Sequence, residues 1–376
     1  MAKYIYQYNN WPHFTWNEQE IQVILGKVRH LQGKLLGQMN ALGFSLKEEA
    51  VFSTLTLDVL KSSEIEGKKL NYEQVRSSIA RRLGIDYAGM IHSDRDVEGV
   101  VEMMLDATQN YNHLLDEERL FGWHAALFPT GRSGMQKIET ACYRHGEMQV
   151  VSGPMGKEKI HYQAPSPSQV KDEMDAFLDW FNNATKTDIV LKAAIAHFWF
   201  IIIHPFGDGN GRIARALSDL LLARSDDSSQ RFYSLSSQIL VERKVYYEIL
   251  QKIQYSKGDI TDWLNWFLNC LYRALEATDE TMKKALHKAE FWDKHKENVL
   301  NGRQRLMLNK LLDGFDGKLT SSKWAKISKC SQDTAVRDIQ DLIDKKILYK
   351  LLEGGRSTGY DLINKIDDKI QADNNV

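Results

Sequence analysis

The chain has few of the features that mark secreted or nucleic-acid-binding proteins. Only three of its 376 residues are cysteines (Cys142, Cys270 and Cys330), and their positions have no metal-ligand spacing. Three cysteines cannot all pair, so we expect a protein of the reducing cytoplasm. The formal net charge is −1, which excludes an overall basic excess that would favour nucleic acid or an anionic membrane. No internal repeat or low-complexity tract is evident.

Long hydrophobic runs are missing as well. The first residues, Met1 to Tyr8, lack the apolar core of a signal peptide. The apolar run at residues 193–203 is too short to cross a bilayer. We therefore expect a soluble, cytoplasmic protein with no membrane partner, and the length suits two or three domains.

The most informative segment is a polar turn between two apolar helical patterns. It reads His204-Pro-Phe-Gly-Asp-Gly-Asn-Gly-Arg-Ile-Ala-Arg215 and lies between the apolar residues 193–203 and 213–222. Pro205 ends the first helix, because a residue that precedes proline is disfavoured in the helical region. Loops held between buried elements are where binding and catalytic sites are commonly built.

The residue types in this turn suit a phosphate-bearing substrate. Its glycines let a ligand approach the main chain, and the following helix N-terminus adds partial positive charge. Arg212 and Arg215 share one helix face and offer planar forks of donors to phosphates. Asp208 is a hard oxygen ligand for Mg²⁺, and His204 is a candidate base. Each residue alone has a structural alternative, such as an ordinary turn or a solvated arginine, but the whole string is far more constrained.

The segment from His204 to Arg215 matches every defining position of the Fic motif, so the chain resembles the Fic family. The resemblance implies transfer of AMP from ATP to a Ser, Thr or Tyr hydroxyl of a target protein, or of the chain itself, with release of pyrophosphate. It implies that His204 is the base and that Asp208 holds Mg²⁺ between the α- and β-phosphates. The nucleotide contacts that it implies in the turn are Gly209, Asn210 and Gly211, with Arg212 at the β-phosphate and Arg215 at the γ-phosphate.

Two further segments extend the resemblance. The stretch from Tyr143 to Gly153 is expected to form a short hairpin. It resembles the Fic flap, which aligns a target by strand addition, and an ordinary surface hairpin is the alternative. Residues 241–250 resemble a helix that walls the adenine pocket, with plain core packing as the alternative. The additional nucleotide contacts implied are Val150, Val151, Ser152, Gly153, Tyr246, Tyr247, Leu250 and Gln254.

An upstream segment, Ser62-Ser-Glu-Ile-Glu66-Gly67, matches the inhibitory pattern of Fic proteins. The resemblance implies that Glu66 pairs with Arg215 and keeps the γ-phosphate from its productive position. One guanidinium cannot serve a carboxylate and a phosphate in the same geometry. The local alternative is a capping box made by Ser63 and Glu66, which would place Glu66 at a helix N-terminus.

We expect a mainly α fold. Its parts are an N-terminal helical region with the inhibitory motif (1–96), a Fic-type helical core with a β-hairpin flap (97–280), a helical linker (281–300) and a winged-helix-like domain (301–376). Within the first region we expect helices at 17–42, 47–60 and 71–83, the last behind the cap Asn71.

The C-terminal domain is expected to contain helices at 303–312, 320–327 and 331–343. A hairpin of residues 347–352 and 358–362 follows, with its turn at Gly354 and Gly355. In the usual docking of a winged helix, Thr334, Arg337 and Arg356 face DNA. Acidic and basic residues alternate here, so a protein-interaction or homodimer module is the alternative.

The leading hypothesis is an autoinhibited protein adenylyltransferase that uses ATP and Mg²⁺ and acts on a target protein. One alternative is an enzyme of the same fold that removes AMP, with Glu66 orienting a water molecule. Another is a transcriptional regulator whose Fic domain senses nucleotide. A relative that transfers a different phosphate-containing group is a third alternative.

Overall fold

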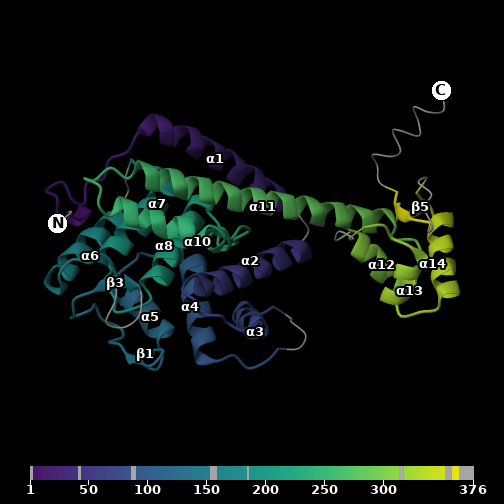
Figure 1. Ribbon diagram of the computed structural model, residues 1–376, viewed down its shortest axis with the longest axis horizontal. Coiled ribbons are helices and arrows are strands. Elements are labelled where there is room, and N and C mark those ends of the chain that lie inside the picture. Colours follow the sequence, from purple (N-terminus) through teal and green to yellow (C-terminus); the bar gives the residue numbers. More distant parts are fainter. Residues whose placement is uncertain are drawn as a thin grey trace. The chain divides into compact units, whose positions relative to one another are not determined.

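The computed structural model describes residues 3–40, 44–85, 90–152, 159–183, 186–312, 315, 317–351 and 358–363. The chain divides into two compact units, Met1–Thr278 and Asp279–Val376. The described residues form fourteen α-helices and three small two-stranded sheets, which confirms the mainly α prediction (Figure 1).

The first unit begins with a 3₁₀ turn at Ile5–Gln7 and contains ten complete helices and the start of an eleventh. Before the flap these are α1 (Glu18–Asn40), α2 (Phe44–Ile65), α3 (Tyr72–Leu83), α4 (Arg95–Gln109) and α5 (Glu117–Leu127). After the flap they are α6 (Pro167–Asn182), α7 (Ile189–Ile203), α8 (Asn210–Asp226), α9 (Leu235–Val241), α10 (Arg243–Ile253) and α11 (Thr261–Lys294).

Local sequence signals explain where several of these helices begin and end. The Asn71 side chain accepts a hydrogen bond from the Gln74 amide at 3.0 Å, as its cap position predicts. Gly84 ends α3 in the left-handed conformation, which is favourable for glycine. Helix α7 is apolar on nearly all sides and almost fully buried, so it is the centre of the core.

Helix α8 packs against α7, and helices α2 and α4 also contact α8 (Figure 1). Because α7 and α8 are consecutive, the polar turn between them is held by the most buried part of this unit. The end of α2 is brought to the same region by its packing on α8 and α9. This packing decides which distant residues meet at the turn.

The hairpin flap begins later than predicted. Residues from Tyr143 to Met148 are in no strand, and the hairpin pairs β3 (Gln149–Ser152) with β4 (Lys159–Gln163). The reason is Arg144, whose buried guanidinium donates to the carbonyls of His204 and Pro165 at 2.8 and 2.6 Å. These bonds hold the segment in an irregular conformation. A small hairpin of β1 (Arg132–Ser133) and β2 (Gln136–Lys137) precedes it.

The second unit contains α12 (Gly302–Leu312), α13 (Ser321–Ile327) and α14 (Gln332–Asp344), then β5 (Leu348–Lys350) paired with β6 (Tyr360–Leu362). An antiparallel bridge joins Leu319 to Tyr360. Trp324 and Met307 are fully buried in its own hydrophobic cluster. Thr334 and Arg337 lie on α14, but Arg356 and the predicted Gly354-Gly355 turn lie outside the described residues. DNA binding stays a prediction.

Residues 281–294, expected to belong to a helical linker, are the last part of α11. No described helix has the length and the apolar character that crossing a bilayer requires.

Candidate active site

The turn that joins α7 to α8 contains two residues in the left-handed conformation. His204 has φ of 52°, in the left-handed region where a non-glycine residue is strained. Gly209 has φ of 82°, and a Cβ there would lie 2.9 Å from the ring of Phe128. Asn210 bonds the main chain of Phe206 twice, at 3.0 and 2.8 Å. These contacts hold the turn in one shape.

His204 has one ring nitrogen that can accept a proton. Its Nδ1 lies 3.1 Å from the Ile201 carbonyl oxygen. Because a carbonyl only accepts, this bond places the proton on Nδ1 and leaves Nε2 to take a proton. Burial lowers the pKa of His204, and Arg144 adds to that effect, while the Ile201 bond, Glu66 and Asp208 oppose it. The imidazole is therefore neutral at pH 7, as a base requires.

Asp208 lies in the same turn and is half-buried. Its carboxylate accepts hydrogen bonds from the Ser133 hydroxyl and from the Gly209 amide. The buried ring of His124 stacks on Phe206 nearby, with centroids 4.3 Å apart. Burial lowers the pKa of His124 to about 4 although Asp208 raises it, so this ring is neutral at pH 7.

Arg212 is a buried cation without an acceptor for part of its guanidinium. Its residue is only 5% exposed, and Nε and Nη1 have no hydrogen-bond partner among the described residues. The guanidinium lies over the Phe128 ring at 4.9 Å. Unsatisfied buried donors cost about 1–3 kcal/mol each, so they point to an absent acceptor. The nearby N-terminus of α8 also favours an anion.

Arg215 is 1% exposed and its acceptors come from the end of α2. Its Nη2 lies 2.8 Å from Oε1 of Glu66. Its Nε donates to the Ser62 hydroxyl at 2.9 Å, and its Nη2 donates to the Ser62 carbonyl at 2.8 Å. Burial alone would lower the pKa of Arg215, but the Glu66 carboxylate raises it above its usual value. Ser62 and Glu66 thus hold this guanidinium from two sides.

Glu66 follows the C-terminus of α2, so the capping-box alternative is wrong: Ser63 lies in the last turn of that helix. Gly67 has φ of 80° and reverses the chain, with its amide bonded to the Glu64 carbonyl at 2.9 Å. The Glu66 carboxylate also accepts a hydrogen bond from the Tyr247 hydroxyl at 3.3 Å. A Cβ at Gly211 would overlap Oε1 of Glu66, so this glycine makes room for the carboxylate.

A second set of buried charges lies one helical turn before Ser62 on α2 and one turn after Arg215 on α8. Asp58 accepts from the Ser234 hydroxyl, and Asp219 pairs with Arg231 at 2.8 Å. Burial and the charge of Asp219 raise the pKa of Asp58, although Arg231 opposes them. The sequence analysis missed this set. Its signal in the sequence is the four-residue spacing of Asp58 and Ser62, which places both on one face of α2.

The residues expected near adenine divide into buried and exposed positions. Tyr246 is 1% exposed, and its hydroxyl lies 2.9 Å from Nε2 of the buried His197. Tyr247 is 41% exposed beside Glu66. Gln254 donates to the His161 carbonyl in β4 at 2.6 Å, and Leu250 is partly buried on α10. Tyr247 thus presents surface at the site, whereas Tyr246 belongs to the core, and their contact with adenine stays a prediction.

In the flap, Val150 and Val151 are 39% and 46% exposed, and a register shift lies between them. Ser152 ends β3, and Gly153 lies outside the described residues. Val151 pairs with Ile160, which is also exposed, so the hairpin carries an apolar surface.

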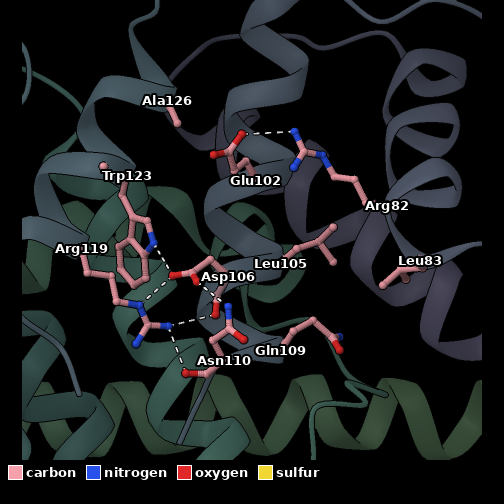
Figure 2. A pocket seen from close by; sticks show the side chains of 11 residues that line it. Arg82, Leu83, Glu102, Leu105, Asp106, Gln109, Asn110, Arg119, Trp123 and Ala126 are labelled. Carbon is pink, nitrogen blue, oxygen red and sulfur yellow. Dashed lines mark hydrogen bonds and ion pairs between the residues drawn. The ribbon is translucent and has the colours of Figure 1, made fainter. Parts of the chain in front are cut away.

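A separate cavity of about 470 Å³ lies between α3, α4 and α5 and contains no residue of the turn (Figure 2). Its charges are paired internally: Arg119 and the Trp123 indole both donate to Asp106 at 2.7 Å, and Arg82 pairs with Glu102 at 3.2 Å. Because these groups have their partners, we place the candidate site at the turn.

Two segments of the chain match family models. The Fic/DOC family matches residues 114–222, and a domain of unknown function (DUF4172) matches residues 4–85. A protein adenylyltransferase Fic of Nematostella vectensis is 34% identical over 119 residues, which cover 30% of this chain and 25% of that protein. Another from Aedes aegypti is 26% identical over 226 residues, which cover 58% of this chain and 40% of that protein. The chain thus spans less than half the length of these relatives.

Two solved structures share the fold. A Fic family protein from Desulfovibrio desulfuricans G20 has a TM-score of 0.55 at 21% identity, over 94% of this chain and 98% of that one. Residues 134–508 of Fic-1 from C. elegans give a TM-score of 0.50 at 23% identity, over 70% and 74% of the two chains. The segment 114–222, which matches the Fic/DOC family model, includes the whole turn from His204 to Arg215, and the chain has the helical fold of these two Fic structures.

Proposed function

We propose that the chain is an autoinhibited protein adenylyltransferase that transfers AMP from ATP to a hydroxyl of a target protein. The observation that carries this proposal is the buried guanidinium of Arg212, whose Nε and Nη1 have no partner among the described residues, in the same turn as a neutral base and a carboxylate. A polyphosphate supplies the acceptors that Arg212 lacks. The names of the curated relatives support this choice of reaction.

In the proposed reaction the target hydroxyl oxygen attacks the α-phosphorus of ATP. The bond from that phosphorus to the bridging oxygen breaks, and pyrophosphate leaves. Nε2 of His204 takes the hydroxyl proton, because Nδ1 is committed to the Ile201 carbonyl. Arg212 and the amides at the start of α8 stabilise the charge that develops on the phosphates.

Mg²⁺ is the metal that this donor set fits. Asp208 offers a half-buried carboxylate beside the phosphate cradle, and Mg²⁺ typically takes one or two carboxylates together with substrate phosphates. A bound Mg²⁺ supplies neutralisation of phosphate charge. Asp208 would hold it, and Ser133 would keep the Asp208 carboxylate in place.

The flap is the proposed docking surface for the target. Strand β3 pairs with β4 and with no other described strand, so its second edge is available for strand addition. Val150 and Val151 are exposed there. Main-chain pairing positions the target hydroxyl. Contacts outside this pairing would determine which protein is the target.

The inhibitory contact is proposed to be the ion pair of Glu66 with Arg215. A γ-phosphate that bonds Arg215 must compete with Glu66 for the same donors. Release of Glu66 would therefore raise transfer.

The experiment is a mass measurement of AMP addition. The Glu66→Gly chain, incubated with ATP, Mg²⁺ and a cell lysate, should add AMP to itself or to a lysate protein. The additional substitution His204→Ala should reduce the rate by about 10²–10⁴-fold and leave ATP binding in place. Equal rates with and without His204, or removal of AMP without any addition, would contradict the proposal.

A further inference from the structure

A second group of metal-ligand side chains lies outside the turn. Glu139, Cys142 and His145 belong to the loop between β2 and β3, and their ligand atoms all lie within 4.8 Å of one another. The three residues are evenly spaced, three apart. The cysteines have no metal-ligand spacing among themselves, but this glutamate and this histidine complete a mixed set around Cys142.

The loop is held in the conformation that brings these side chains together. Ala141 has φ of 57°, a left-handed conformation that turns the chain directly before Cys142. The Ile138 amide bonds the Gly131 carbonyl at 3.0 Å, and the Arg144 amide bonds the Pro205 carbonyl at 2.9 Å. Glu139 and Cys142 thus lie between two fixed points of the main chain, and His145 directly follows the second.

The side chains are accessible and already converge. Oε2 of Glu139 and Nδ1 of His145 are 2.9 Å apart, and these side chains are 61% and 77% exposed. Cys142 is partly exposed beside them. A bound ion would replace the hydrogen bond between Glu139 and His145 and the thiol proton of Cys142.

The ligand types of Glu139, Cys142 and His145 indicate which metal would bind. Thiolate, imidazole and carboxylate are the three ligand types of protein-bound Zn²⁺, whereas Mg²⁺ and Ca²⁺ prefer oxygen ligands alone. Three protein ligands leave the fourth tetrahedral position to water or to a partner's side chain. We propose that Glu139, Cys142 and His145 bind a Zn²⁺ ion at the base of the flap, separate from the Mg²⁺ proposed at Asp208.

Binding at this place would fix the segment that leads into the flap. Arg144 lies between two of the ligands and donates to the His204 carbonyl at 2.8 Å. An ion held by Cys142 and His145 therefore restrains the chain on both sides of Arg144. The thiol proton is released to solvent when the thiolate binds, so affinity should fall at acidic pH.

The test is metal binding by the full chain after removal of metals with a chelator. Zn²⁺ titrated in competition with a chelating dye should bind tightly to the wild-type chain. Cys142→Ser or His145→Gln should weaken that binding. Loss of a group that only orients a ligand costs about 10–100-fold in affinity, so loss of a direct ligand should cost at least that much. Cys330→Ser is the matched control, because Cys330 is also partly exposed but has neither Glu139 nor His145 beside it.

Co²⁺ provides a second readout that does not depend on activity. The wild-type chain and Cys330→Ser should show thiolate-to-cobalt charge-transfer absorption, and Cys142→Ser should not. Glu139→Gln, at an exposed position, should weaken binding without affecting folding. Zn²⁺ affinity that is equal in the wild type and in Cys142→Ser, or a cobalt spectrum without a thiolate band, would overturn the proposal.

Discussion

Nη2 of Arg215 lies 2.8 Å from Oε1 of Glu66, and the same guanidinium bonds Ser62 twice. Helix α2, which contains Ser62 and ends directly before Glu66, packs on helix α8 in the core. The carboxylate therefore stands where the proposed γ-phosphate would need the same donors.

Gly211→Ala should displace Glu66. The new Cβ would overlap Oε1 of Glu66 and lie 3.0 Å from its Cδ. We expect the substitution to lower the free energy of unfolding by about 1–3 kcal/mol, and by less in a Glu66→Gly background, where the obstacle is gone. Urea denaturation of the four chains measures this coupling. Gly207→Ala is the control, because a Cβ there meets no atom within 4 Å. An equal cost of Gly211→Ala in both backgrounds would show that Glu66 does not occupy this space.

Arg212→Met should separate stability from nucleotide binding. Removing a buried guanidinium with unpartnered donors should leave the melting temperature unchanged or raise it. The affinity for ATP should fall by about tenfold or more, because charge-assisted hydrogen bonds to phosphate are lost. Calorimetry gives both quantities. Arg144→Met is the contrasting variant: its guanidinium is bonded to carbonyls, so it should lower the melting temperature. If Arg212→Met lowers the melting temperature and leaves the ATP affinity unchanged, Arg212 has a structural role and does not bind phosphate.

The pKa of His204 should lie below the usual value for histidine, because the ring is desolvated and Arg144 disfavours its cationic form. Loss of the neutral base as the pH falls should therefore begin below about pH 6.5. Because the Glu66 charge raises this pKa, Glu66→Gly should lower it further. NMR titration of the His204 ring in both chains checks the direction. A pKa at or above the usual value, or one unaffected by Glu66→Gly, would contradict the account.

His197 should make the fold sensitive to acid. Its buried ring bridges Ser218 and Tyr246, and burial together with Arg215 lowers its pKa to about 3. The unfolded chain takes up this proton near pH 6.5, so the unfolded state binds more protons and stability falls as pH drops from there toward 3. The loss attributable to His197 is about 3 kcal/mol between pH 7 and pH 4.5.

Urea denaturation at these two pH values measures the loss. His197→Gln should show a smaller difference between them, and His13→Gln, at an exposed position, should behave as the wild type does. If His197→Gln loses as much stability as the wild type between these pH values, groups other than His197 cause the loss.

The sequence predicts those helices and turns whose residues form a local pattern. Helix α12 was expected at residues 303–312 and spans Gly302–Leu312, because its amphipathic period identifies it. The turn from His204 to Arg215 was identified because its defining residues are contiguous. By contrast, the later start of the flap depends on Arg144, whose partners are carbonyls distant in the sequence. The pairs Asp58–Ser234 and Asp219–Arg231 likewise depend on helix packing, which no local pattern reports.

The most direct test of the central claim compares Glu66→Gly with Glu64→Gly. Glu64 is the matched control, because it lies in the same segment but pairs with Lys61 at 2.8 Å instead of Arg215. The measurement is the initial rate of AMP incorporation from ATP labelled on its α-phosphate, with Mg²⁺ and equal amounts of folded chain. If Glu66 holds Arg215 away from the γ-phosphate, Glu66→Gly should incorporate AMP about tenfold faster or more, and Glu64→Gly should match the wild type. Equal rates for the wild type and Glu66→Gly would contradict the claim that this ion pair inhibits transfer.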